Sequence, residues 1–402
     1  MKNKNVIMIG GFLQDDFIDY YISKSKFPYE NAASNLQKKI IDGFIKNDYN
    51  ISFINTRLIK PYSKNNKILK CNYTTSKYKD KVDLFNLGFL NLKLLNHFSI
   101  LKSLKMIFKN KKFDAESILI YSAYFPYIKL ASYLKKNKYN MNITLIVPDL
   151  PKYMGLNSKK SIYNKFALFI SNKIVLKNLS SIDSFVYLTK HMNNVLNIYN
   201  KPYIIMEGIA DEREFNEYNY SSDLSKKILL YTGSLQYMYG IKDLLEAFEL
   251  THNDNFQLII CGQGEAESEV IKYCNIDSRI KYLGNIDKNE IMKLQLRATA
   301  LINPRKNNND FTKYSFPSKN LEYLSSGNPV IAYKLDGIPD KYDLHFIYVE
   351  DDKPETLARV VEKTLLLSEE EKKHIHDINI RFVSSLKSNE QVYRIIKLMM
   401  EK

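Results

Sequence analysis

The stretch from Phe316 to Ala332 combines a polar loop, a short helical pattern, a glycine and an apolar strand pattern. Lys319 stands at the expected helix start, and Glu322 follows one turn later. Free N–H groups at a helix start favour an anion, a lysine adds a full positive charge, and a carboxylate accepts hydrogen bonds from sugar hydroxyls. The pattern therefore suits a phosphate beside a ribose. It suits an ordinary helix start, with Pro317 near the first turn, equally well.

The elements that would position this stretch form two α/β halves. The chain has 402 residues, of which 45% are hydrophobic, so it can fill two cores. Short apolar runs alternate with helical patterns, which predicts parallel sheets covered on both faces. The runs are 6–9, 51–54, 117–121, 143–147, 184–188, 203–206, 228–231, 256–261, 280–283, 301–302, 330–333 and 346–349. Segment 211–227 is polar and without a period, which predicts a linker between the halves.

Glycine turns follow several of the predicted strands. They are Gly10 with Gly11, Gly233, Gly262 with Gly264, and Gly284. Glycine lets the backbone approach a ligand closely, and ligands of open parallel sheets lie at the carboxyl ends of the strands. We therefore expect these turns to line one cleft, although Gly10 and Gly11 also fit a plain turn.

The ordered set of motifs in the second half resembles the retaining glycosyltransferases of family 4, which have the GT-B fold of two Rossmann-like domains. The segments that carry the resemblance are 228–235, 240–248, 258–265, 282–291 and 315–332. The Phe-Pro-Ser-Lys form of the last segment resembles a branch that builds bacterial surface polysaccharides. The resemblance covers most of the chain and is strongest between Ile228 and Ala332.

The resemblance implies an architecture and a reaction. It implies an acceptor domain over 1–208, a donor domain over 209–384 and a last helix, 385–402, that crosses back to the first domain. A nucleotide-diphosphate sugar would be the donor, a glycan or lipid-linked molecule the acceptor, and neither a cofactor nor a metal would be needed. The implied donor-binding residues are Gly11, Gly233, Ser234, Gly262, Gly264, Gly284, Tyr314, Ser315, Phe316, Ser318 and Glu322, and the implied acceptor-binding residues are Gly10 and Lys190.

Three positions depart from the family's pattern. Ser234 and Tyr239 stand where relatives often carry an arginine and a lysine that clamp the diphosphate, and Tyr314 stands where the first of two glutamates belongs. Asp310, or the N–H groups of residues 315 and 316, would replace that glutamate. These losses favour an alternative function, a non-catalytic GT-B subunit that binds nucleotide or acceptor and supports a partner transferase.

The catalytic work then falls on other residues. We predict that Arg305 and Lys319 neutralise the departing diphosphate, because a guanidinium contacts phosphate in a bidentate manner, and that Glu322 binds the ribose. The competing interpretations are a solvated loop arginine and an exposed helix carboxylate. Asp149 either orients the acceptor hydroxyl or is a turn residue between prolines. Lys190 is either a phosphate contact or a helix start.

Charge points to an acidic partner. The net charge is +15, and segment 84–112, taken as one helix, has an apolar face and a basic edge. Such a helix either lies on an anionic membrane surface or is a core helix with outward lysines. The three cysteines are scattered and no apolar run spans a bilayer, which predicts a cytoplasmic protein, peripheral at the membrane's inner face. Modules for specific nucleic-acid binding are not recognisable.

Overall fold

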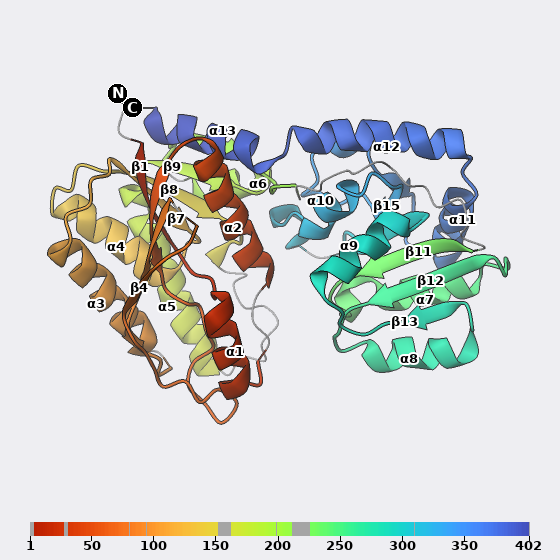
Figure 1. Ribbon diagram of the computed structural model, residues 1–402, viewed down its shortest axis with the longest axis horizontal. Coiled ribbons are helices and arrows are strands. Elements are labelled where there is room, and N and C mark those ends of the chain that lie inside the picture. The colour runs from red at the N-terminus through yellow and green to blue at the C-terminus, as the bar shows by residue number, and fades with distance from the viewer. Residues whose placement is uncertain are drawn as a thin grey trace. The chain divides into compact units, whose positions relative to one another are not determined.

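The computed structural model describes residues 4–27, 31–79, 81–93, 95–151, 162–197, 199–210, 226–308 and 310–401. The chain divides into two compact units, Met1–Ile209 with Ser388–Lys402, and Ala210–Lys387. Each is built around one large sheet (Figure 1). Residues 211–225 of the predicted linker lie outside the described residues.

The first unit contains an eight-stranded sheet. Its strands are β1 (Asn5–Gly10), β2 (Asn50–Asn55), β4 (Thr74–Lys77), β5 (Val82–Asn86), β7 (Ser117–Tyr121), β8 (Asn142–Val147), β9 (Ser184–Tyr187) and β10 (Tyr203–Ile205). They run in the order β10-β9-β8-β7-β1-β2-β5-β4, and among these neighbours only β4 and β5 pair antiparallel. From β1 the chain first adds strands on one side of the sheet (β2, β5 and β4) and then on the other side (β7 to β10). Because parallel crossovers are right-handed, the helices of the two sides lie on opposite faces of the sheet.

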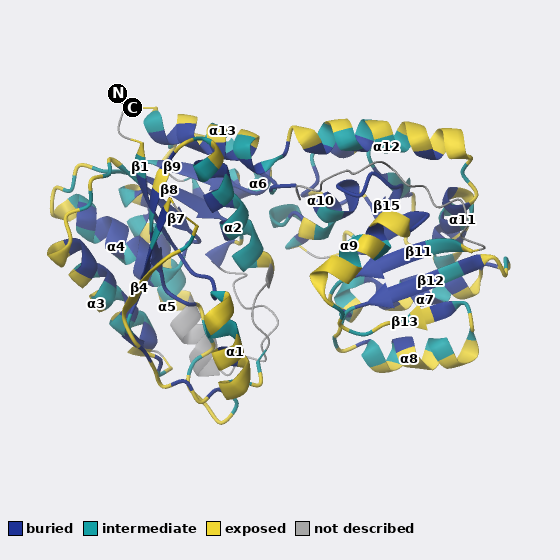
Figure 2. Ribbon diagram, viewed as in Figure 1, coloured by how far each residue is buried: buried dark blue, intermediate teal, exposed yellow. Residues whose placement is uncertain are grey.

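Among the described residues, seven α-helices accompany this sheet. They are α1 (Asp15–Lys24), α2 (Asn31–Lys46), α3 (Leu95–Asn110), α4 (Phe125–Lys136), α5 (Ile162–Asn178), α6 (Lys190–Leu196) and α13 (Ser388–Met400). Val6 and Met8 share a core with Ile41 of α2 and Val392 of α13. Helices α3, α4 and α5 pack side by side. Strand β1 is buried from Val6 to Gly10 (Figure 2). Because successive side chains of a strand point to opposite faces of the sheet, β1 contributes to a core on either face.

The prediction of one helix over 84–112 is wrong. Residues up to Asn86 belong to β5, and Phe89–Leu90 forms β6, which pairs with β3 (Lys70–Cys71). The helix α3 begins only at Leu95. The strands β5 and β6 and the helix α3 all contain leucine and phenylalanine, so the apolar pattern continues across the boundary between the strands and the helix.

The second unit contains a six-stranded parallel sheet. Its strands are β11 (Lys227–Thr232), β12 (Phe256–Cys261), β13 (Ile280–Tyr282), β14 (Ala300–Asn303), β15 (Val330–Tyr333) and β16 (Ile347–Val349), in the order β13-β12-β11-β14-β15-β16. Its helices are α7 (Ile241–Glu249), α8 (Glu267–Ile276), α9 (Lys288–Arg297), α10 (Ser318–Leu324), α11 (Pro354–Leu365) and α12 (Glu369–Ser384). Leu229 packs with α7, α8 and α11, whereas Leu230 packs with α10 and α12. The predicted sheet with two covered faces is confirmed.

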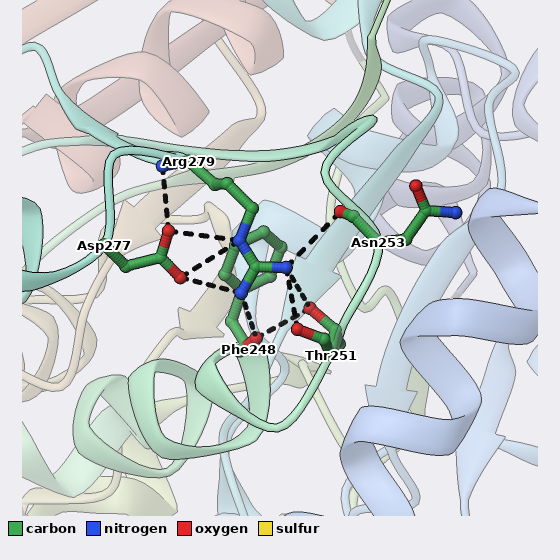
Figure 3. Close-up of polar contacts among 5 residues, drawn as sticks. All are labelled: Phe248, Thr251, Asn253, Asp277 and Arg279. Carbon is green, nitrogen blue, oxygen red and sulfur yellow. Dashed lines mark hydrogen bonds and ion pairs between the residues drawn. The ribbon is translucent and has the colours of Figure 1, made fainter.

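Arg279, which precedes β13, ties together three segments of the second unit (Figure 3). Its guanidinium pairs with Asp277 at 2.7 Å and donates to the carbonyl oxygens of Thr251 at 2.7 Å and Asn253 at 3.3 Å. The group also lies 5.0 Å from the ring centroid of Phe248. The contact with Arg279 holds the pKa of Asp277 below its ordinary value. The arginine therefore fixes the turn after α7 to the start of β13.

Replacing Arg279 by alanine should destabilise the second unit by about 2 kcal/mol, because two turn carbonyls and Asp277 lose a charged donor. Thermal unfolding followed by circular dichroism should show a transition lowered by several degrees. Lys281→Ala, at an exposed site two residues later, is the matched control and should leave the transition in place. Equal melting of both variants and the unmodified chain would contradict the anchoring role.

Candidate functional site

The glycine turns after β11, β12 and β13 interlock at the carboxyl end of the second sheet. The Gly233 N–H donates to the Cys261 carbonyl at 2.9 Å, and the Gly262 N–H donates to the Gly284 carbonyl at 2.7 Å. A Cβ at Gly262 would lie 1.7 Å from the Gly233 carbonyl oxygen. Only glycine fits there, because a side chain would force the neighbouring turns apart. The sequence-predicted turns are thus brought together on adjacent strands.

The other two predicted glycines have different roles. A Cβ at Gly264 would lie 2.4 Å from the carbonyl oxygen of Leu235, so this glycine permits close packing of two turns. Gly284 has a φ of +68° with open space around a hypothetical Cβ, so its requirement is the left-handed backbone and not crowding. Ser234 is exposed, and its carbonyl accepts the Tyr231 hydroxyl at 2.8 Å.

Lys319 and Glu322 lie together above these turns. Helix α10 begins at Ser318, so the two residues are separated by one turn and share a face. The Lys319 Nζ lies 3.0 Å from Glu322 Oε2 and 3.1 Å from Oε1. Lys319 Cε would be 3.7 Å from a Cβ at Gly233. Lys319, the predicted phosphate contact, and Glu322, the predicted ribose contact, are therefore neighbours and form an ion pair with each other.

A buried hydrogen-bond network supports this pair from the core. Tyr323 is fully buried; its hydroxyl accepts the Thr232 N–H at 2.9 Å and donates to the Thr232 carbonyl at 2.9 Å. Gln295 donates to Thr232 Oγ1 at 3.1 Å and to Glu322 Oε1 at 2.7 Å. Sequence reasoning missed Gln295. Its only signal is a polar residue between Leu294 and Leu296 in a helical pattern.

Arg305 is buried, which rules out the interpretation as a solvated loop arginine. The residue is 8% exposed, and Nη2 donates to Ser315 Oγ at 2.9 Å. The guanidinium carbon lies 5.7 Å and 4.7 Å from the ring centroids of Tyr239 and Phe311. Desolvation lowers the pKa of Arg305. Within the described part of the chain no carboxylate pairs with it, and its Nε has no hydrogen-bond partner.

The remaining residues of the signature divide between the surface and the core. Tyr314 is half-buried at the end of a short 3-10 helix, Thr312–Tyr314, and Ser318 is exposed at the start of α10. Phe316 is buried, with its ring centroid 5.1 Å from that of Tyr342. The aromatic side chain of Phe316 therefore anchors the loop in the core.

In the first unit, Gly10 and Gly11 end β1 as predicted, but their backbone groups are already bonded. Gln37 of α2 receives the Gly11 N–H at 2.9 Å and donates to the Gly11 carbonyl at 2.8 Å. The buried Tyr127 hydroxyl donates to the Gly10 carbonyl at 2.9 Å. A Cβ at Gly10 would lie 2.1 Å from Gln37 Oε1. The absence of side chains at Gly10 and Gly11 therefore leaves room for the Gln37 side chain. Nothing in the sequence around Gln37 indicated this contact.

Asp149 and Lys190 lie beyond the carboxyl ends of two neighbouring strands. Asp149 follows β8 in an exposed bend, and Lys190 is the exposed first residue of α6, just after β9. Because β8 and β9 are adjacent and parallel, both residues belong to the same edge of the sheet. Their predicted acceptor roles stay predictions.

Comparison with known proteins defines the class. Residues 212–379 match the family model described as "Glycosyl transferases group 1". No curated protein matches the chain in sequence. Among solved structures, the α,α-trehalose-phosphate synthase (UDP-forming) from Burkholderia xenovorans in complex with glucose-6-phosphate is 10% identical, with a TM-score of 0.70, over 99% of this chain and 100% of that chain.

Two further structures are similar over nearly their whole length. The trehalose-6-phosphate structure from E. coli bound with UDP-2-fluoro glucose is 11% identical, with a TM-score of 0.69 and 99% of each chain covered. The sucrose-phosphate synthase from Thermosynechococcus elongatus is 12% identical, with a TM-score of 0.66 and 98% of each chain covered. At these identities the likeness shows the fold, which is GT-B as predicted. With a glycosyl transferases group 1 domain in its second unit, the chain is a glycosyltransferase.

Proposed function

We propose that this glycosyltransferase takes its sugar from a nucleotide-diphosphate sugar bound by the second unit, with retention of configuration and without a metal. The acceptor is a glycan or lipid-linked molecule bound by the first unit, and the product is a cell-surface polysaccharide. The resemblance of segment 315–332 to the surface-polysaccharide branch is the reason for proposing this acceptor and this product. UDP in the names of two structural neighbours motivates the choice of UDP sugars as first donors to test.

The observation that carries the donor proposal is the buried charge of Arg305, with which no carboxylate of the described residues pairs. Removing a cation from water without a partner is costly, so such groups are normally paired or bind an anion. Its Ser315 and two aromatic neighbours are neutral and leave the positive charge uncompensated. A diphosphate would supply the missing anion and take up the Nε donor. Negative charge grows on that diphosphate as the glycosidic bond breaks, so a fixed guanidinium lowers the barrier.

Lys319 and Glu322 complete the donor proposal. Their ion pair lies beside Gly233, at the end of the central strand β11. Binding of a donor would draw the Lys319 ammonium to phosphate and open the Glu322 carboxylate to ribose hydroxyls. Lys319 would exchange a carboxylate for a phosphate, and Glu322 would exchange an ammonium for hydroxyl donors while it keeps its hydrogen bond from Gln295.

The donor proposal is tested by a thermal-shift series with UDP-, GDP- and dTDP-linked sugars. A bound donor raises the unfolding temperature according to its affinity and concentration. We expect one nucleotide class to stabilise the chain, and Arg305→Ala to abolish that shift. Free monosaccharide is the negative control. No shift with any nucleotide sugar, at concentrations up to the millimolar range, would contradict the proposal.

We further propose that the exposed face of α3 lies on an anionic membrane surface. Leu95, Phe98 and Met106 are 52%, 63% and 49% exposed, and Lys102 and Lys109 are exposed on the same helix. Its opposite face is buried through Ile100, Leu104 and Ile107. Apolar side chains with flanking lysines suit the boundary between headgroups and acyl chains. Of the described helices, none is long and apolar enough to cross a bilayer.

Replacing Lys102 and Lys109 of α3, together with the exposed Lys112 two residues after the helix, by glutamine should weaken binding to vesicles of phosphatidylcholine with phosphatidylglycerol about 100-fold, at roughly 1 kcal/mol per lysine. Co-sedimentation at low salt measures the effect. The charge-matched control replaces three exposed lysines of the second unit, Lys272, Lys281 and Lys288. If both triple variants sediment alike, the attraction is a general effect of net charge and α3 is not the docking face.

A further inference from the structure

Gln295 is a buried amide behind the candidate donor site. It is the one buried residue of α9, and its side chain is fully shielded from solvent. Its backbone carbonyl accepts Asn328 Nδ2 at 2.8 Å, so main chain and side chain are both held. Nε2 donates to Glu322 Oε1 at 2.7 Å and to Thr232 Oγ1 at 3.1 Å. One side chain therefore joins α10 to the end of β11.

Glu322 Oε1 is shared between two donors of different mobility. Gln295 is rigid and buried, whereas the Lys319 side chain is 35% exposed and carries a flexible stem. An anion near Gly233 would attract the lysine away from the carboxylate. The amide would then keep Glu322 in place and Oε2, which now faces Lys319 at 3.0 Å, would be open to a ligand hydroxyl.

We propose that Gln295 is the positioning residue for the ribose contact of the donor nucleotide. This proposal rests on the proposed function of the site. It adds that the Gln295 amide holds the Glu322 carboxylate in position before the nucleotide binds. A carboxylate that is already held in one rotamer loses less conformational freedom when the ligand binds, so the ligand binds more tightly. Through Thr232, the same amide also fixes the residue before Gly233. Gln295 therefore sets the spacing between the ribose contact and the phosphate turn.

The test uses calorimetric titration of the full chain with UDP, GDP and ADP, each compared with its 2′,3′-dideoxy form. We expect Gln295→Leu to weaken the ribonucleotide that binds about tenfold. Binding of its dideoxy form should change less than about twofold, since no hydroxyl then needs the carboxylate. In a Glu322→Gln background the same Gln295→Leu change should have little further effect, because the two residues act as one unit.

Equal weakening of the ribose and dideoxy forms by Gln295→Leu would overturn the proposal and leave Gln295 a structural residue. Gln295→Met, which keeps the unbranched shape, serves if the leucine variant melts early. The unmodified chain provides an independent check, because equal affinity for ribose and dideoxy forms would also overturn the proposal. If the unmodified chain binds none of these nucleotides and no nucleotide sugar of the thermal-shift series stabilises it, the proposed function itself fails, which is a distinguishable result. Stabilisation by a dTDP-linked sugar alone would overturn the ribose proposal and leave the donor proposal standing.

Discussion

Replacing Arg305 by alanine should lower kcat/KM for the donor about 100- to 1000-fold, the loss typical when one preorganised donor to a developing anion is removed. The same change should leave the unfolding temperature equal or higher, because it removes a buried charge without a partner. Stability and activity would therefore move in opposite directions. Initial rates with the preferred nucleotide sugar, together with thermal unfolding, measure both effects.

Two further variants sharpen the Arg305 prediction. Arg305→Lys keeps the charge but lacks the planar fork, so it should recover only part of the activity. Arg359→Ala removes an exposed arginine of the same unit and should be close to unmodified in rate and stability. A stable Arg305→Ala variant with full activity would remove the residue from the site. A strongly destabilised variant would assign it a structural role.

The second large effect is expected at the ion pair of Lys319 and Glu322. Lys319→Ala and Glu322→Ala should each lower kcat/KM about 100-fold while the fold stays intact. Lys319→Ala removes a contact that strengthens as the diphosphate departs, and Glu322→Ala removes a contact that binds the ribose of the donor. The double variant should lose less than the sum of the two, since the side chains are 3.0 Å apart and interact. Steady-state kinetics of the three variants measure this coupling.

Lys363→Ala is the matched control for the lysine, because it lies exposed on α11. Strictly additive losses would show that the two residues serve separate steps. Unchanged turnover in either single variant would exclude that residue from the donor site, even if the ion pair itself is real.

Continuous apolar runs with clear borders made most of the fold predictable. The strands 117–121, 256–261 and 330–333 were expected with the bounds that β7, β12 and β15 have. The edge strand β4 was not expected, because all four residues of Thr74–Lys77 are exposed and polar. Its strand character comes from pairing with β5, which local sequence does not encode.

The site was predictable only where its contacts are local. Lys319 and Glu322 meet because helical residues three apart share a face. The burial of Arg305 depends on Tyr239 and Phe311, which come from other segments. Gln295 and Gln37 likewise take their roles from partners far along the chain.

The division of the chain has a consequence for synthesis. Val392, Ile395 and Ile396 of α13 fill the core of the first unit, although they follow the whole second unit in the sequence. The second unit, 210–387, is contiguous and complete as soon as residue 387 has left the ribosome. The first unit must wait, with the apolar face of α2 uncovered, until α13 has also been made. A chain that stops before α13 would therefore carry a finished second unit and an unfinished first one.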